Sequence, residues 1–226
     1  MSSKRLSIVV PYRNRKEHMG LFVPYMEKFL TEAGIEFQIT LAEQEDGKPF
    51  NRAKLLNVGF DIDKDSADYF CFHDVDMIPI EADYSWVNEP THMATECSQF
   101  GYALPYIGYF GGVTLFNKKD FIDVNGYSND YWGWGAEDDD MHARCVVKSK
   151  IPANAPPNSN IPRRRGRYES LAHDRVINRE EYISNIEKLR NLNKENANSE
   201  GLTTLQYTLI RTTNITDKTK ICTVSI

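Results

Sequence analysis

The first 76 residues alternate between short apolar runs and helical patterns, and this order restricts the fold more than any other feature of the chain. Leu6–Tyr12 is an apolar run that ends at polar residues, which is typical of a buried parallel strand. Ile35–Ala42 and Asp68–His73 predict two further strands, and Asn51–Phe60 predicts a helix between them. A helix between the first two strands, which ends at Gly34, is expected to bury one apolar face. That face comprises Leu21, Phe22, Tyr25, Met26, Phe29 and Leu30. The chain therefore predicts an α/β domain with a central, mostly parallel sheet flanked by helices.

Charged side chains follow two of these predicted strands. Arg13 and Arg15 come directly after the first strand, and Asp74-Val75-Asp76 follows the third. Because ligands of α/β domains bind beyond the carboxyl ends of the strands, we expect these side chains to meet in one site. Paired carboxylates favour a hard divalent cation, and arginine suits phosphate because its planar fork donates two hydrogen bonds at once. A diphosphate bound with a metal fits this edge of the sheet, whereas Asp-x-Asp alone is also found in solvated turns.

The segment 131–140 sets two tryptophans among glycines directly before Glu137, Asp138, Asp139 and Asp140. Glycine weakens both helix and strand, and crowded carboxylates gain nothing from burial without partners. Flat aromatic surface beside carboxylates suits a sugar, whose C–H faces lie on indoles and whose hydroxyls bond to carboxylates. The alternative interpretation is a solvated acidic turn after a buried aromatic pair. The acids also begin a predicted helix, Glu137–Val147, where they favour the helix dipole.

The second half of the chain is less regular. Phe110–Phe116 predicts a strand entered through Gly111-Gly112, where another group approaches the backbone closely. Residues 152–201 are rich in Pro, Asn and Arg, and only Arg179–Leu192 is helix-like. We expect this region to be a mobile lid or a long surface excursion. No repeat or linker divides the sequence, which predicts one domain over residues 1–226.

Composition narrows the functional classes. The 226 residues are 41% hydrophobic and 26% charged, as in an ordinary globular protein, and the net charge of −5 argues against nucleic-acid binding. The sequence contains no apolar stretch of about 18 residues, so it predicts no membrane span, and its first residues lack a signal-peptide core. The cysteines lie far apart without metal-type spacing, and Cys71 is predicted as a buried thiol. These features predict a cytoplasmic protein, or a secretory-pathway lumenal one if the chain is part of a longer protein. They indicate no oligomeric state.

Several motifs occur in an order that resembles the β-1,4-galactosyltransferase family, whose members have a GT-A fold of Rossmann-like type. They are Val10-Pro11-Tyr12-Arg13-Asn14-Arg15, Phe50–Phe60, Asp74-Val75-Asp76, Tyr109–Val113, Trp132–Asp140 and Gly201–Tyr207. The resemblance implies an enzyme that transfers galactose from UDP-galactose to a sugar hydroxyl, using manganese and inverting the anomeric centre. It implies a nucleotide-sugar-binding half over residues 1–110 and an acceptor-binding and lid half over residues 111–226.

The resemblance also implies roles for individual residues. The expected donor-binding residues are Pro11, Arg13, Arg15, Arg52, Asp74, Tyr109, Gly112 and Trp134. The expected acceptor-binding residues are Trp134, Glu137 and Asp138, and Asp138 is the expected general base. Asp76 and His173 are the expected metal ligands. Tyr109 stands where the family's galactose users carry tyrosine and its N-acetylgalactosamine users carry a smaller aliphatic residue, which favours a galactose donor.

The chain departs from the family pattern just before His173. Family members usually place a second ligand, Met or His, a few residues earlier, where this chain has Ser170 and Leu171. Glu169 is a candidate third ligand if the segment is helical, because residues i and i+4 then share a face. A carboxylate there would harden the site and relax it toward magnesium. Water in the vacant position is the alternative.

The mechanism expected from these residues is a single in-line displacement. A carboxylate takes the proton of the acceptor hydroxyl while a metal and arginines stabilise the departing UDP on the other side of the sugar. The expected product is a β-1,4 linkage to terminal N-acetylglucosamine or a related sugar such as glucose or xylose. The alternatives are a carbohydrate- or nucleotide-sugar-binding module that has lost catalysis, and a GT-A transferase that uses UDP-N-acetylgalactosamine. Tyr109 argues against the second alternative.

Overall fold

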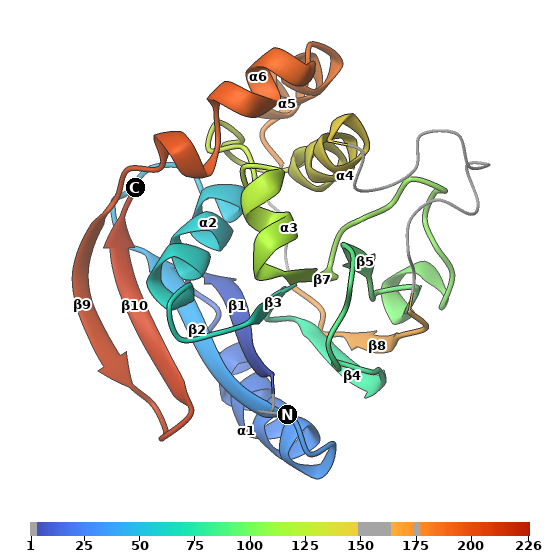
Figure 1. Cartoon of the computed structure of the whole chain (residues 1–226), viewed down its shortest axis with the longest axis vertical. Coiled ribbons are helices and arrows are strands. Elements are labelled where there is room, and N and C mark those ends of the chain that lie inside the picture. Colours follow the sequence, from blue (N-terminus) through green and yellow to red (C-terminus); the bar gives the residue numbers. More distant parts are fainter. Residues whose placement is uncertain (1–3, 149–163, 174–176) are drawn as a thin grey trace.

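A seven-stranded sheet forms the centre of the molecule (Figure 1). The structure, a computed structural model, describes residues 4–148, 164–173 and 177–226. The strand order is β5-β7-β3-β1-β2-β10-β9. The strands are β1 (Arg5–Tyr12), β2 (Glu36–Gln44), β3 (Tyr69–His73), β5 (Thr91–His92), β7 (Val113–Asn117), β9 (Thr208–Asn214) and β10 (Thr219–Ser225). The three strands predicted from the first 76 residues are therefore confirmed, with ends that differ by one or two residues.

The middle of the sheet is parallel and its edges are antiparallel. β1 lies between β2 and β3, and Ile8 is opposite Ile39 on one side and Cys71 on the other. β10 extends the parallel set beyond β2, whereas β7 and β9 run antiparallel to their neighbours. Buried parallel strands need apolar side chains on both faces, which accounts for the continuous apolar run of β1.

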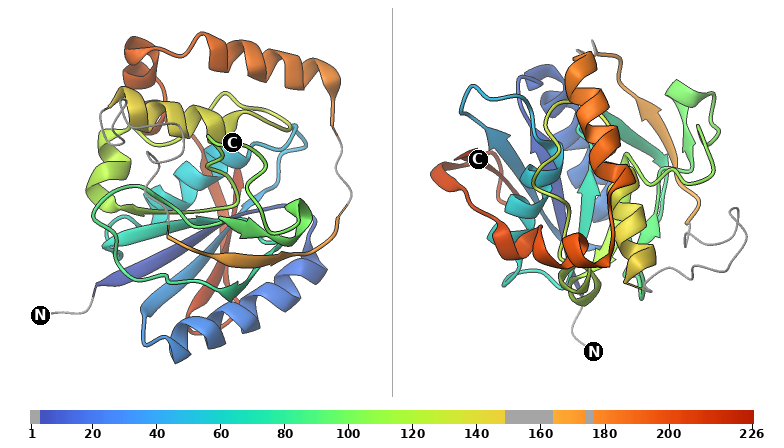
Figure 2. Two further views of the ribbon diagram at one scale, coloured as in Figure 1. Left: turned by 90° about the vertical axis from the view of Figure 1, so that its right-hand side faces the viewer. Right: turned by 90° about the horizontal axis from the view of Figure 1, so that it is seen from above.

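Helices cover both faces of the sheet, as Figure 2 shows. α1 (Lys16–Glu32) packs Phe22, Met26 and Leu30 into the cluster that contains Leu6, Ile8 and Val10 of β1. α2 (Arg52–Asp63) packs Leu56 and Phe60 on the other face, in the cluster of Val9, Phe70 and Phe72. Successive side chains of a strand point to opposite faces, so β1 supplies both clusters.

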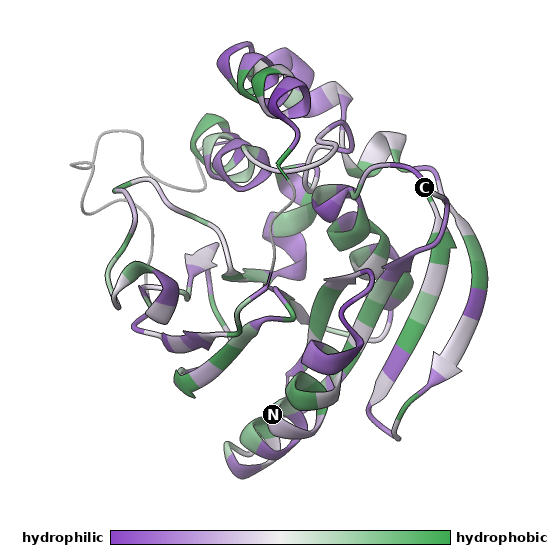
Figure 3. Ribbon diagram, turned by 180° about the vertical axis from the view of Figure 1, so that it is seen from behind, coloured by the Kyte–Doolittle hydropathy of each residue, from purple (hydrophilic) through white to green (hydrophobic). Residues whose placement is uncertain are grey.

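The predicted apolar face of α1 is wrong in two positions. Leu21 and Tyr25 are exposed, whereas Phe22, Met26 and Leu30 are buried. The buried stripe follows the i, i+4, i+8 spacing, and Leu21 and Tyr25 each precede it by one residue, about 100° around the helix. Figure 3 shows the resulting alternation of hydrophobic and hydrophilic residues along the helices around the hydrophobic strands.

A second, smaller sheet lies beside the carboxyl end of β3. Its strand order is β4-β8-β6, formed by β4 (Met77–Glu81), β8 (Arg167–Ser170) and β6 (Glu96–Cys97). β8 pairs antiparallel with β4, which places Ser170 opposite Met77 and the following residues next to Asp76. The helix considered for the segment around Glu169 is therefore wrong: the segment is a strand, held by pairing with residues far away in the sequence.

The remaining helices lie in the second half of the chain. They are η1 (Ser98–Phe100), α3 (Lys118–Asp123), α4 (Glu137–Val147), α5 (Arg179–Arg190), α6 (Lys194–Ser199) and η2 (Leu202–Thr204). α4 has the predicted bounds, and α5 ends two residues before the predicted Leu192. The hairpin of β9 and β10 was not predicted, because its strands are recognisable only from their pairing beside β2. Part of the predicted lid over residues 152–201 lies in residues 149–163 and 174–176, outside the described residues, so its mobility stays a prediction.

Two composition-based expectations concern the whole chain. All four cysteines are free and buried, including Cys71 in the middle of β3. Among the residues that the structure describes, no helix combines the length and apolar character needed to cross a membrane.

Candidate active site at the carboxyl edge of the central sheet

Asp76 and His173 meet just beyond the end of β3. His173 Nε2 lies 3.1 Å from Asp76 Oδ2, although the two residues are 97 positions apart in the chain. Arg15, which follows β1, brings its Nη2 to 3.3 Å from His173 Nδ1. Burial and the neighbouring charge of Asp74 raise the pKa of Asp76, against the lowering effects of His173 and His18. The structure therefore brings Arg15 and Asp76 together at one sheet edge, as the strand ends predicted, with His173 between them.

The Asp76–His173 pair has the geometry of two ligands on one divalent cation. Two atoms at neighbouring corners of an octahedral cation, each about 2.1 Å from it, lie about 3 Å apart. A carboxylate oxygen and an imidazole nitrogen at 3.1 Å match that spacing and suit a borderline-hard metal such as manganese. Within the described residues, no group of three or more His, Cys, Asp or Glu side chains is assembled around a metal position.

Glu169 does not join this pair in the described structure. It lies on the exposed face of β8, and its carboxylate accepts a hydrogen bond of 2.9 Å from the Tyr102 hydroxyl. The helical spacing that favoured Glu169 as a third ligand is absent, so the argument for this residue fails.

Arg52 connects the end of β3 to the acidic segment. It is the first residue of α2 and follows the N-cap residue Asn51, whose side chain accepts a hydrogen bond of 2.8 Å from the backbone N–H of Lys54. Arg52 Nε lies 2.6 Å from Asp74 Oδ1, and its Nη1 lies 3.6 Å from Glu137 Oε1. Burial opposes the charge of Arg52, but Asp74 and Glu137 outweigh it and raise the pKa of Arg52 well above its usual value. Its buried Nη1 makes no hydrogen bond to another described residue. A buried cationic N–H without an acceptor is costly, which points to an anionic ligand.

Asp138 lies at the start of α4, close to the glycine pair that enters β7. A Cβ on Gly111 would overlap the Asp138 carboxylate, so this backbone needs glycine to let the acid approach. Burial, followed by the charges of Glu137 and Asp139, raises the pKa of Asp138 to about 8. A carboxylate with a pKa near the working pH is suited to accept a proton in catalysis.

Tyr109 lies beside the glycine pair that enters β7, as Asp138 does. A Cβ on Gly111 would overlap both the Asp138 carboxylate and the Tyr109 ring. The Tyr109 hydroxyl would be 3.5 Å from a Cβ on Gly112, whose φ of +75° favours glycine. Burial raises the pKa of the Tyr109 phenol, and the charges of Asp138 and Asp74 add to this effect. Tyr109, Gly112 and Asp138 are thus gathered at the entrance to β7, and the backbone N–H of Asp74 donates to the Gly112 oxygen at 3.0 Å.

Two predicted donor residues lie further out. Pro11 is buried within β1 opposite Ala42, where only its backbone and ring can contribute. Arg13 turns toward the loop after β2: its Nη1 donates to the backbone oxygen of Lys48 at 2.7 Å, and its guanidinium lies 5.1 Å from the Phe50 ring centre. The structure therefore does not bring Arg13 to the Asp76–His173 pair.

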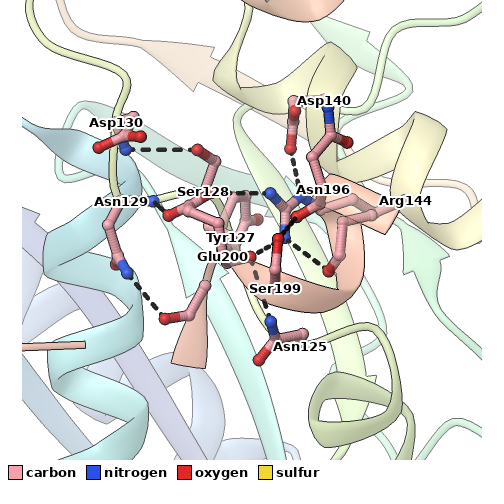
Figure 4. A network of polar contacts seen from close by, with 12 residues as sticks. Asn125, Tyr127, Ser128, Asn129, Asp130, Asp140, Arg144, Asn196, Ser199 and Glu200 are labelled. Atoms are coloured by element: carbon pink, nitrogen blue, oxygen red, sulfur yellow. Dashed lines mark hydrogen bonds and ion pairs between the residues drawn. The ribbon is translucent and has the colours of Figure 1, made fainter. Parts of the chain in front are cut away.

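Within the acidic run 137–140, Asp140 has a structural role, whereas Asp138 faces the glycine pair that enters β7. Asp140 is buried and receives hydrogen bonds from Arg144 Nε at 2.5 Å and from the Tyr131 hydroxyl at 3.0 Å. Arg144 also donates to the backbone oxygen of Glu200 at 2.7 Å and to its carboxylate at 2.9 Å (Figure 4). This network ties α4 to the chain after α6, and so fixes the end of the helix that carries Asp138.

Sequence reasoning missed this anchor. The Asp140 and Arg144 spacing of i, i+4 is the only signal, and it is shared by ordinary exposed pairs. Asn129 was also missed: its side chain donates to the backbone oxygen of Gly201 at 2.7 Å and receives a hydrogen bond of 2.9 Å from Asn57. These contacts hold the segment before Trp132 against α2.

Trp134 is exposed on the surface, in the loop that leads into α4 and Asp138. It follows Gly133 and precedes Gly135, both at positive φ, and its ring centre lies 5.7 Å from that of Tyr182 on α5. The site therefore consists of a cation-binding edge, a bridging arginine, a carboxylate of raised pKa and an exposed aromatic surface. Together they can bind a metal-complexed anion and remove a proton from a polar ligand.

Comparison with known protein families gives two adjoining matches. Residues 1–87 match the N-terminal region of glycosyl transferase group 7. Residues 91–174 match the family described as the N-terminal domain of galactosyltransferase. The two matches together include the arginines after β1, the Asp-x-Asp motif, the acidic segment and His173.

Individual proteins agree with these matches. Human β-1,4-galactosyltransferase 1 is 35% identical over 214 residues, which are 93% of this chain and 52% of the human protein. Human β-1,4-galactosyltransferase 4 is 37% identical over 214 residues, or 92% of this chain and 59% of that protein. The chain thus spans little more than half the length of these relatives.

Solved structures show the same architecture. The catalytic domain of Drosophila β-1,4-galactosyltransferase 7, complexed with xylobiose, superposes with a TM-score of 0.81 at 26% identity, covering 99% of this chain and 94% of that one. A mutant of the Drosophila protein, complexed with manganese, UDP-Gal and xylobiose, gives a TM-score of 0.78 at 24% identity with the same coverage. The predicted GT-A architecture is thereby confirmed.

Proposed function

This chain belongs to the β-1,4-galactosyltransferase family, and we propose that it transfers galactose from UDP-galactose to a hydroxyl of an acceptor sugar. The reaction is metal-dependent and inverts the anomeric centre. Residues 1–110 supply most of the nucleotide-sugar site, and residues 111–226 supply the acceptor site.

One observation carries the proposal: Arg52 pairs with carboxylates on both sides, and these stand within two residues of Asp76 and directly before Asp138. Asp76, next to His173, neighbours Asp74, which is paired with Arg52. Arg52 in turn reaches Glu137, the residue before Asp138. A donor held by the first of these residues therefore lies beside an acceptor held by the last.

The donor side is built to accept negative charge. Arg52 offers a buried N–H that makes no hydrogen bond within the described part of the chain, and Arg15 lies against His173. Asp76 and His173 would hold a manganese or magnesium ion, which when bound stabilises the charge that develops on the departing diphosphate. Because these groups are fixed before the reaction, they stabilise the charge without reorganisation.

The acceptor side is built to remove a proton. Asp138 takes the proton from the acceptor hydroxyl as that oxygen bonds to the anomeric carbon, and its pKa of about 8 makes it a stronger base than an ordinary aspartate. The hydroxyl attacks from the side opposite the departing UDP, so a single displacement inverts the centre. Glu137 and the exposed Trp134 ring orient the acceptor.

The acceptor proposed is a terminal N-acetylglucosamine or a related sugar such as glucose or xylose, joined through its 4-hydroxyl. The Drosophila relative, complexed with manganese, UDP-Gal and xylobiose, supports a sugar acceptor and this donor and metal. Tyr109 beside Gly112 supports galactose rather than N-acetylgalactosamine.

The test is release of UDP from UDP-galactose with manganese, measured for N-acetylglucosamine, glucose and xylose and for a blank without acceptor. UDP-N-acetylgalactosamine and the Asp138→Asn variant serve as controls. Acceptor-dependent release that the variant lacks is the expected result. Binding of UDP-galactose without release for any acceptor would instead identify a binding module, and preferred use of UDP-N-acetylgalactosamine would contradict the donor assignment.

A further inference from the structure

α5 is fitted closely to the loop that carries Trp134. Asn185, fully buried on α5, donates to the backbone oxygens of Trp132 at 3.0 Å and Trp134 at 3.5 Å. A Cβ on Gly133 would overlap the Glu181 carboxylate, and one on Gly135 would lie 3.0 Å from the Tyr182 ring. The loop thus has glycine at both positions where α5 approaches it, and Figure 2 shows α5 lying along α4 above the sheet.

This fit places a second aromatic ring beside Trp134. The ring centres of Trp134 and Tyr182 are 5.7 Å apart and their planes are inclined by 31°. The two residues remain 45% and 37% exposed, respectively. Two large aromatic residues exposed side by side, next to a candidate active site, indicate a surface for a ligand rather than a core.

Tyr182 extends the aromatic surface beyond Trp134. Asp138 lies in the first turn of α4, four residues after Trp134, whereas Tyr182 contacts Trp134 from α5. In a pyranose the 4-hydroxyl and the anomeric carbon lie at opposite ends of the ring. A sugar that lies on Trp134 with its 4-hydroxyl toward Asp138 therefore has its anomeric carbon at the other end of the ring, and Tyr182 is a second exposed ring against Trp134 that can receive the attached unit.

We infer that Tyr182 binds the unit attached to the anomeric carbon of the acceptor, through the flat apolar face of a second sugar ring or of an aromatic aglycone. The inference rests on the proposed function. It means that the enzyme is built for glycosides rather than for free monosaccharides. An additional aromatic contact of this kind is worth roughly a 2- to 10-fold gain in affinity.

The test compares three acceptors at saturating UDP-galactose and manganese: free N-acetylglucosamine, its β-p-nitrophenyl glycoside and its β-1,4-linked dimer. KM and kcat are measured separately for wild type, Tyr182→Ala and Tyr182→Phe. Wild type should prefer at least one glycoside through a lower KM. Tyr182→Ala should lose that preference, with kcat unchanged and the free sugar unaffected, whereas Tyr182→Phe should keep it because the ring remains. The glycoside whose preference disappears identifies the unit that is bound.

Ile183→Ala is the matched control, since Ile183 is the next residue of α5 and is 46% exposed. It should behave as wild type. An equal loss for all three acceptors in Tyr182→Ala would overturn the inference and assign Tyr182 to positioning Trp134. An unchanged preference in Tyr182→Ala, or no preference in wild type, would also overturn it.

Binding of the same acceptors in the presence of UDP and manganese, followed by ligand-observed NMR, separates this inference from the proposed function. Absence of galactose transfer to any acceptor would refute the proposed function. Weaker binding of a glycoside to Tyr182→Ala than to wild type would still support the subsite, and equal binding would refute it.

Discussion

Replacing Arg144 by methionine should destabilise the protein far more than the same change at an exposed arginine. The Arg144 side chain is 2% exposed and makes charge-assisted hydrogen bonds to Asp140 at 2.5 Å and to Glu200 at 2.9 Å. Methionine fills much of the same volume but has no charge. The Asp140 carboxylate would then stay buried with only the Tyr131 hydroxyl as a partner.

The magnitude follows from the burial of the pair. Removing one partner of a buried ion pair costs about 3–5 kcal/mol, because the other charge is left without compensation. For a chain of this size each kcal/mol lowers the melting temperature by about 2–4 °C, so a fall of roughly 6–20 °C is expected. Arg211 is the matched control: it is 53% exposed and pairs with Glu45 at 2.9 Å. Exposed pairs contribute about 0–1 kcal/mol.

Urea unfolding followed by circular dichroism measures both variants. The midpoint of Arg144→Met should fall while the slope stays constant, and that of Arg211→Met should stay near wild type. The double variant Asp140→Asn/Arg144→Met should recover part of the loss, because a carboxamide needs no cation. If Arg144→Met unfolds at the same urea concentration as Arg211→Met, the reasoning about this anchor is refuted.

Four further predictions concern the site itself. Asp138→Asn should lower kcat by about 10²–10⁴-fold with the fold intact. Because only the ionised acid accepts a proton, kcat/KM of the wild type should rise to about pH 8 and then level off. A pH-independent rate would exclude Asp138 as the base. Between about pH 4 and pH 8 the folded state keeps this proton while the unfolded state loses it, so the associated stability is complete below pH 4, falls through that range and is lost above pH 8. Asp138→Asn should therefore be more stable than wild type at pH 9 but not at pH 4, as melting temperatures will show. His173→Ala should weaken manganese binding at least about tenfold, measured by electron paramagnetic resonance without substrate; unchanged affinity would remove His173 from the metal site. Arg52→Met should weaken UDP binding by calorimetry at least about tenfold, because it removes the cation that faces Asp74 and Glu137, and unaltered binding would argue against its contact with the donor.

Much of the site could be predicted because it depends on where strands end. The apolar run of β1 and the Asp-Val-Asp after β3 are local patterns, and parallel pairing brings their ends together whatever the rest of the chain does. Resemblance of ordered motifs then supplied the family, which the comparisons confirm. By contrast, the place of His173 beside Asp76 was implied by the resemblance alone, since no local pattern joins residues so far apart.

The sequence by itself determined the parallel α/β core, the α4 boundaries and the placing of Arg15, Asp74 and Asp76 at one edge of the sheet, whereas the role of Asp138 came from the resemblance. Only the tertiary structure decided that Glu169 lies on a strand and contacts Tyr102, and that Arg13 turns away toward Lys48. It alone decided that Asp140 is a buried anchor while Asp138, two residues earlier, faces the site. Local patterns record which side chains are apolar and how they repeat. Which partner a charged side chain meets depends on segments folded against it from elsewhere in the chain, and its burial and pKa follow from that partner.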